Sequence, residues 1–110
     1  YLERKKLGEL LFPKIAEGSD IRRIVKDYGE AAKRCKEGGL DGVEIEAYGH
    51  LMDSFWSPRT NLRKDKYGGS LDNRARFSLE VIEEIRKKVG QGMFNGHMNQ
   101  MSNYYFQLQY

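Results

Sequence analysis

The sequence predicts an α/β fold, and three observations on the order of its elements indicate this class. A stretch with helical spacing covers residues 21–37, a short apolar run covers residues 40–46, and a second helical stretch covers residues 71–89. Helical and strand-like stretches that follow one another along a chain are typical of α/β domains with parallel strands. We therefore expect the arrangement helix–strand–loop–helix.

A short helix is predicted over residues 2–12, and a longer one follows it. Ser19 or Asp20 is the expected N-cap of the longer helix, and Gly38 with Gly39 is expected to end it. Apolar side chains recur between these ends at helical spacing: Ile21, Ile24, Val25, Tyr28, Ala31, Ala32 and Cys35. Because Cys35 is the only cysteine and lies on this stripe, we expect it in the core and expect no intrachain disulfide.

The strand prediction depends on the run from Leu40 to Glu46. Val43 and Ile45 share one face of such a strand, while Glu44 and Glu46 share the other, because side chains alternate along a strand. In a barrel of strands wrapped by helices, the apolar pair suits the helix layer, so both glutamates would lie inside the barrel or at its rim. The ends of such strands and the loops after them carry the reacting side chains.

An acid, a phenol and an imidazole stand directly at the end of this predicted strand, in the segment Glu46-Ala47-Tyr48-Gly49-His50. We therefore predict Tyr48 and His50 as catalytic residues, and Glu46 and Trp56 as substrate-binding residues. Structural alternatives stay open, since Glu46 can pair with a base from another strand and Trp56 can serve packing alone. No metal site is predicted, because His50 has no second ligand at a suitable spacing.

A long loop over residues 54–69 leads to the second helix, which Ser70 is expected to cap and Gly90 to end. Its predicted apolar stripe consists of Leu71, Ala75, Leu79, Ile82, Ile85 and Val89. The loop backbone is expected to be tied to the helix start by Asp65, Ser70, Asn73 and Arg76.

The composition changes abruptly after Gly90. Every Asp, Glu, Lys and Arg lies within the first 90 residues, whereas residues 91–110 are rich in Gln, Asn, Met and Tyr and show no alternation. We therefore expect residues 1–90 to carry the α/β pattern and residues 91–110 to form an irregular tail. The chain starts at Tyr1 rather than at a methionine, which favours an internal fragment or a processed product.

The charge pattern bounds the partners of the chain. The net charge is +3 and the isoelectric point is about 9.0, but the basic residues are mixed with acids, which is more typical of a solvated surface than of a nucleic-acid site. No apolar run approaches the roughly 20 residues that a membrane helix needs. We expect a small-molecule substrate, no nucleic acid, no membrane, and a cytoplasmic location, which a single cysteine fits.

Three stretches of this sequence resemble one family: AAKRCKEGGLDGVEI, FWSPRTNLRKDKYGGSLDNRARF and LEVIEEIRKKVG. Residues 20–90 are similar there to the old yellow enzyme family of FMN-dependent NADH:flavin oxidoreductases. The resemblance implies a partial (β/α)8 barrel, FMN as the cofactor, NAD(P)H as a reductant and hydride transfer through the flavin. A whole barrel needs about 250 residues, so this chain would hold one or two of the eight strands and be inactive alone.

The segment after the predicted strand departs from the family pattern His-x-x-His/Asn-Gly-Tyr, in which the first two side chains bond a substrate oxygen. This chain is one residue shorter there, and Glu46, Tyr48 and His50 replace the three patterned residues. Reduction of an activated alkene needs hydrogen-bond donors at the developing oxyanion, and a carboxylate cannot donate. A carboxylate beside aromatic rings attracts an alkylammonium instead.

The segment therefore resembles the amine dehydrogenase and demethylase branch of the family. Two alternatives stay open at this point. One is an ene-reductase of the same family, and the other is a non-catalytic helical binding module, which the basic isoelectric point and the two amphipathic helices support.

Overall fold

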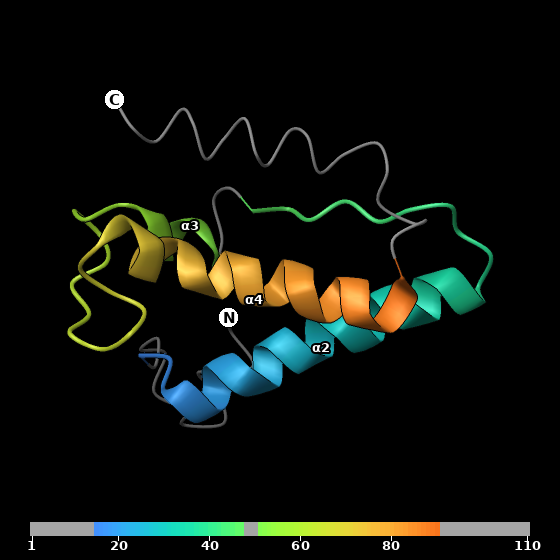
Figure 1. The fold of residues 1–110 in the computed structure, drawn as a ribbon, viewed down its shortest axis with the longest axis horizontal. Coiled ribbons are helices and arrows are strands. Elements are labelled where there is room, and N and C mark those ends of the chain that lie inside the picture. The colour runs from blue at the N-terminus through green and yellow to red at the C-terminus, as the bar shows by residue number, and fades with distance from the viewer. Residues whose placement is uncertain (1–14, 48–50, 91–110) are drawn as a thin grey trace, which may run out of the picture.

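The computed structural model describes residues 15–47 and 51–90, which form the helices α2 (Gly18–Glu37), α3 (Asp53–Trp56) and α4 (Leu71–Val89). α2 packs along α4, and α3 lies beside the first turns of α4 (Figure 1). The helix predicted over residues 2–12 and the tail predicted over residues 91–110 lie outside the described residues. None of the described helices is long and apolar enough to cross a bilayer.

The start of α2 differs from the prediction. The helix begins at Gly18, so Glu17 is the N-cap and neither Ser19 nor Asp20 takes that position. Asp20 caps the helix from its third residue instead, because the backbone N–H of Glu17 donates to Asp20 Oδ2 at 2.9 Å. This bond satisfies one of the backbone N–H groups that a helix start leaves without partners.

The end of α2 agrees with the prediction that Gly38 and Gly39 stop the helix. The backbone of Gly39 has φ 83°, in the left-handed region that glycine adopts without strain. The N–H of Gly39 donates to the carbonyl oxygen of Lys36 at 3.0 Å, and the N–H of Leu40 donates to that of Cys35 at 3.1 Å. These two bonds form a Schellman motif, which turns the chain back along the helix pair.

The strand predicted from Leu40 to Glu46 is not formed within the described residues. The segment runs extended beside α4 (Figure 1), but a strand also requires hydrogen bonds to a neighbouring strand, and the described residues contain no strand that could supply them. The predicted alternation of its faces is nevertheless present. Val43 and Ile45 pack against the core, whereas Glu44 and Glu46 are exposed.

The bounds of α4 agree with the sequence prediction. Ser70 is the N-cap and its Oγ accepts from the N–H of Asn73 at 3.3 Å, and Gly90 ends the helix with φ 75°. The predicted apolar stripe is only partly right, because Leu79 is 50% exposed. The buried face consists of Ala75, Phe77, Ser78, Val81, Ile85 and Val89. Apolar residues cover more of α4 than one stripe, and the positions of α2 and α3 decide which of them are buried.

The core lies between α2 and α4 and extends to α3. Its buried apolar members are Ile21, Ala32, Met52, Phe55, Tyr67, Phe77, Val81, Ile85 and Val89. Cys35 packs against this core while it stays partly exposed. Two lysines join the long helices at the edges of the core: Lys36 Nζ donates to the carbonyl oxygen of Val89 at 2.7 Å, and Lys88 Nζ donates to Glu30 Oε1 at 2.5 Å.

Candidate functional site

Two of the four predicted site residues, Glu46 and Trp56, lie within the described residues. Tyr48 and His50 lie outside the described residues. Glu46 is exposed at the end of the extended segment, and Trp56 is half-buried at the end of α3. The carbonyl oxygen of Ala47 accepts from the N–H of Asp53 at 3.2 Å. This bond joins the end of the extended segment to the start of α3, so the two described site residues belong to one connected stretch.

α3 is a helical turn within a stretch for which the sequence predicted a loop from residue 54 onward. Its inner side is fixed by Met52 and Phe55, which are 1% and 4% exposed. The Phe55 ring packs against that of Phe77 in α4, with centroids 4.7 Å apart and planes at 35°. Met52, Phe55 and Trp56 follow the i, i+3, i+4 spacing of a helix, which is the signal that could have revealed this turn.

Trp56 is held by α4 at two points. Its indole Nε1–H donates to Ser78 Oγ at 2.9 Å, and its carbonyl oxygen accepts from Arg74 Nε at 2.6 Å. Arg74 and Ser78 are one helical turn apart, so they lie on the same face of α4. The polar edge and the backbone of Trp56 are thus both bonded to the protein, and its side chain packs against the core while it stays partly exposed.

The loop over residues 57–69 is organised around the buried amide of Asn61, which is 7% exposed. Asn61 Nδ2 donates to the carbonyl oxygens of Phe55 and Tyr67, both at 2.7 Å, and Asn61 Oδ1 accepts from the N–H of Arg63 at 3.1 Å. Both N–H groups and the oxygen of this amide are bonded to backbone groups, which shapes the loop. The sequence did not reveal this structural role of Asn61, because an asparagine in a polar loop has no distinctive pattern around it.

Arg63 connects this loop to the start of α2, because its NH1 group donates to the carbonyl oxygen of Ala16 at 2.6 Å. The guanidinium also bonds both carboxylate oxygens of Asp65, which holds the pKa of Asp65 below its ordinary value. Its carbon Cζ lies 5.7 Å from the ring centroid of Phe55 and 5.9 Å from that of Tyr67. The side chain of Arg63 therefore holds the loop in place and is not part of a solvated basic surface.

The helix start binds the loop backbone in the way the sequence predicted. Asn73 Nδ2 donates to the carbonyl oxygen of Gly68 at 3.0 Å, and Arg76 Nε donates to that of Lys66 at 2.9 Å. Asp65 Oδ1 accepts from the N–H of Tyr67 at 3.1 Å. Arg74, which the sequence prediction omitted, donates to the carbonyl oxygen of Gly69 as well.

Tyr67 is a buried tyrosine of the loop, 2% exposed, and its hydroxyl is hydrogen-bonded. Its hydroxyl donates to Glu80 Oε2 at 2.9 Å. Burial raises the pKa of the Tyr67 phenol, so the group stays protonated at neutral pH and donates this bond. Its contacts fasten the loop to α4, and its hydroxyl proton is engaged by Glu80.

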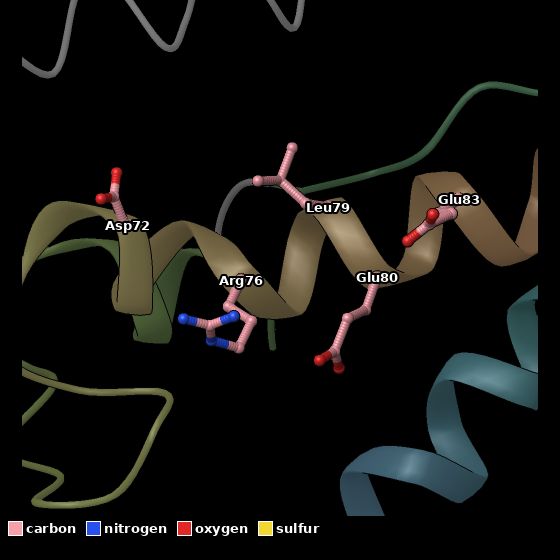
Figure 2. A pocket seen from close by; sticks show the side chains of 5 residues that line it. All are labelled: Asp72, Arg76, Leu79, Glu80 and Glu83. Atoms are coloured by element: carbon pink, nitrogen blue, oxygen red, sulfur yellow. The ribbon is translucent and has the colours of Figure 1, made fainter.

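A shallow hollow of about 380 Å³ lies on α4, lined by Asp72, Arg76, Leu79, Glu80 and Glu83. Figure 2 shows that the side chains of Asp72 and Leu79 point to one side of the helix, whereas Arg76 and Glu80 point to the other. Arg76 and Glu80 are already bonded to the loop. Because these side chains point in different directions and two of them are bonded to the loop, they do not form a common binding surface. We therefore assign no substrate to this hollow.

The described residues neither form a metal centre nor fit a flavin by themselves. They contain no group of three or more potential metal ligands. A flavin phosphate requires cations or backbone N–H groups directed at it, but the guanidinium groups of Arg63, Arg74 and Arg76 in this part of the chain are bonded to carbonyl oxygens. Residues of a flavin cradle are therefore not assigned within residues 15–47 and 51–90.

Comparison with known proteins places this geometry in a family. The sequence profile described as the NADH:flavin oxidoreductase / NADH oxidase family matches residues 2–104. A multifunctional alkene reductase/demethylase of Caballeronia cordobensis is 58% identical over 78 residues, which cover 71% of this chain and 12% of that protein. A probable N-methylproline demethylase of Rhizobium meliloti is 60% identical over 79 residues, which cover 72% of this chain and 12% of that protein.

The fold resembles solved structures of similar sequence. Morphinone reductase in complex with tetrahydroNAD matches with a TM-score of 0.67 and 44% identity, over 71% of this chain and 22% of that one. The chain therefore spans between about a tenth and a quarter of the length of these relatives. The match supports the α/β class predicted from the sequence.

Proposed function

The chain belongs to the NADH:flavin oxidoreductase / NADH oxidase family, and from this premise we propose that it is one segment of the barrel of a longer FMN-dependent oxidoreductase. FMN is the cofactor of the family, and NAD(P)H is a reductant that the relatives' names support. A (β/α)8 barrel needs about 250 residues, whereas this chain has 110. We call the longer protein the parent enzyme, and the extended segment with α4 would supply one strand and one outer helix to its barrel.

The orientation of the extended segment supports this proposal. Val43 and Ile45 pack on the helices, so Glu44 and Glu46 lie on the opposite face, which in a barrel is the face toward the interior. Glu46 is the second of the two along the chain and lies nearest the carboxyl end of the segment. In barrels of this class the chemistry takes place at that end of the strands.

The substrate we propose is an amine that carries a positive charge. The single observation that carries this proposal is the carboxylate of Glu46, exposed at the end of the segment where reduction of an alkene would require a hydrogen-bond donor. The half-buried Trp56 is the last residue of α3, and an aromatic face also attracts an alkylammonium. The relative from Rhizobium meliloti, named as a probable N-methylproline demethylase, agrees with this substrate class.

Alkene reduction is the second candidate function. The relative from Caballeronia cordobensis is named for both alkene reduction and demethylation, so the two activities are compatible within one protein of this family. Tyr48 and His50 stay our predicted catalytic residues for either reaction.

Glu46→Gln in the parent enzyme separates the two reactions, because it removes the charge and keeps the size of the side chain. We expect kcat/KM for an N-methylated amino acid to fall roughly tenfold to a hundredfold. Turnover of a neutral cyclic enone should stay equal or improve, and the flavin absorbance per protein should not change. Glu44→Gln is the matched control, since Glu44 shares the face of Glu46 but lies two residues before it.

The opposite pattern would contradict the amine proposal. If Glu46→Gln leaves amine turnover intact while enone reduction collapses, the site is that of an ene-reductase. If the purified parent enzyme shows no flavin absorbance and binds no FMN, the helical binding module becomes the better interpretation. Tyr48→Phe should reduce amine turnover less than Glu46→Gln does, because the aromatic face remains.

A further inference from the structure

Ser78 is one of two polar residues that are buried in the described part of the chain, and it is 6% exposed. A serine inside a helix commonly bonds the carbonyl oxygen of its own preceding turn. Here its Oγ also accepts from the indole Nε1–H of Trp56 at 2.9 Å, across 22 residues of sequence. A buried hydroxyl that receives an indole N–H fixes both the position and the rotation of that ring, because the N–H has one direction only.

The backbone of Trp56 is fixed from the same face of α4. Arg74 Nε donates to the carbonyl oxygen of Trp56 at 2.6 Å, one helical turn before Ser78. α4 is anchored in turn by the buried side chains of Val81 and Ile85, so it forms a rigid support. The orientation of the Trp56 ring is therefore set by the helix beneath it more than by the loop that follows it.

We propose that Ser78 is a positioning residue for substrate binding, which acts by holding the indole of Trp56 with one ring face turned to the substrate cation. The inference depends on the proposed function, in which Trp56 contacts an amine. Ser78 itself touches no substrate. Without its Oγ the indole N–H loses its partner, and the ring can rotate toward other polar groups, because a buried N–H without a partner is costly.

Ser78→Ala in the parent enzyme tests this, since it deletes one oxygen atom and places a good helix former in α4. We expect the KM for the amine to rise roughly three- to tenfold, as a misaligned cation–π contact would cause, while kcat changes less than about twofold. Ser78→Thr keeps the hydroxyl and should restore the KM. Ser54→Ala is the matched control, because the Ser54 hydroxyl in α3 bonds the carbonyl oxygen of Leu51 and not Trp56.

A spectroscopic measurement makes the test independent of turnover. With 5-fluorotryptophan incorporated, the fluorine resonance that disappears in Trp56→Phe identifies this residue. We expect the Trp56 resonance to shift or broaden in Ser78→Ala, and to keep its position in Ser78→Thr and Ser54→Ala. A merely structural serine would change the melting temperature and this resonance without raising the KM for the amine.

Two results would overturn the inference. One is a Trp56 resonance that Ser78→Ala leaves in place, and the other is a shifted resonance with a substrate KM no higher than in Ser54→Ala. Failure of the amine proposal is distinguishable, because it is decided by Glu46→Gln. An enzyme that reduces only enones would still report the contact between Ser78 and Trp56 through the resonance, while the amine proposal would already have failed with Glu46→Gln.

Discussion

Gly29 of α2 lies so close to Glu84 of α4 that a Cβ atom on residue 29 would be 2.7 Å from Glu84 Cγ and 3.2 Å from Lys88 Cγ. Gly29 is buried in the middle of a helix, where a glycine ordinarily costs stability. The absence of a side chain at this position allows the two long helices to approach each other. The separation of α2 and α4 therefore depends on this residue.

Gly29→Ala should destabilise the parent enzyme, although alanine favours helices. The gain in helix propensity is about 1 kcal/mol, and the cost of forcing an extra methyl group into a packed contact is roughly 1–3 kcal/mol. We expect a net loss, seen as a melting temperature a few degrees lower by circular dichroism. Gly18→Ala is the control, because its Cβ would meet only the tip of Arg22 at 3.4 Å. An increase in melting temperature for Gly29→Ala that matches the control would contradict the close approach.

Asn61→Asp should damage the loop over residues 57–69 more than any substitution at its surface. The carboxylate would face the carbonyl oxygens of Phe55 and Tyr67, each of which now accepts a 2.7 Å bond from the amide. Two buried acceptors would lose their donors, which costs roughly 2–5 kcal/mol in total. The measurement is limited trypsin digestion, which should cut within residues 59–66 faster in the variant. Lowering the pH should slow that cleavage again, because a protonated carboxyl can donate one bond; cleavage that does not depend on pH would argue against this account.

The ion pair between Glu30 and Lys88 predicts a pH dependence of stability. The hydrogen bond from Lys88 holds the pKa of Glu30 below its ordinary value of 4.5, and the same bond raises the pKa of Lys88 above 10.5. The Glu30 contribution is therefore present above pH 4.5 and is lost as the pH falls through its lowered pKa. The Lys88 contribution is present below pH 10.5 and is lost as the pH rises through its raised pKa.

Glu30→Gln should accordingly flatten the acid side of the stability profile. Between about pH 6 and about pH 3 the unmodified protein should lose more melting temperature than the variant does. The effect should be modest, because both side chains are about a third exposed, at 34% and 29%. Asp27→Asn is the control, since Asp27 and Arg23 form a pair that is 61% and 65% exposed. Equal profiles for Glu30→Gln and the unmodified protein would show that the pair contributes nothing.

The 110-residue chain alone should bind FMN weakly or not at all and should fold only marginally. Its extended segment lacks a neighbouring strand within the described residues, and the guanidinium groups of Arg63, Arg74 and Arg76 are bonded to carbonyl oxygens rather than directed at a phosphate. The measurement is a titration of the chain with FMN, followed by quenching of flavin fluorescence. Stoichiometric binding at micromolar or lower concentration would refute this expectation.

Local rules were sufficient to predict three of the four ends of the two long helices, namely the C-terminal end of α2 and both ends of α4. Ser70, Gly90 and the pair Gly38-Gly39 act within one turn of their own positions, so their effect can be deduced from neighbouring residues. The two faces of the segment that contains Val43 and Glu44 could be predicted for the same reason, because alternation follows from backbone geometry.

The features that the sequence did not reveal depend on partners far along the chain. The bond between Trp56 and Ser78 and that between Arg63 and Ala16 join residues 22 and 47 positions apart. Leu79 fits a helical stripe as well as any apolar residue of α4, but the elements packed against α4 leave it half exposed. Periodicity indicates that a face is apolar, but tertiary contacts decide which part of it is buried.

The loop over residues 57–69 has a consequence for protein engineering. Most of its side-chain hydrogen bonds end on main-chain oxygens, so they do not depend on which side chain the accepting residue carries. Gly68 is an exception that cannot be exchanged, because a Cβ on it would clash with the carbonyl oxygen of Arg63. The donors are Asn61, Arg63, Asn73, Arg74 and Arg76. The stretch from residue 55 to residue 77 thus carries nearly all the side chains that hold it in shape. It is a cassette suited to grafting onto a related barrel, in which exposed positions such as Arg59 and Lys64 can be exchanged while the loop keeps its course.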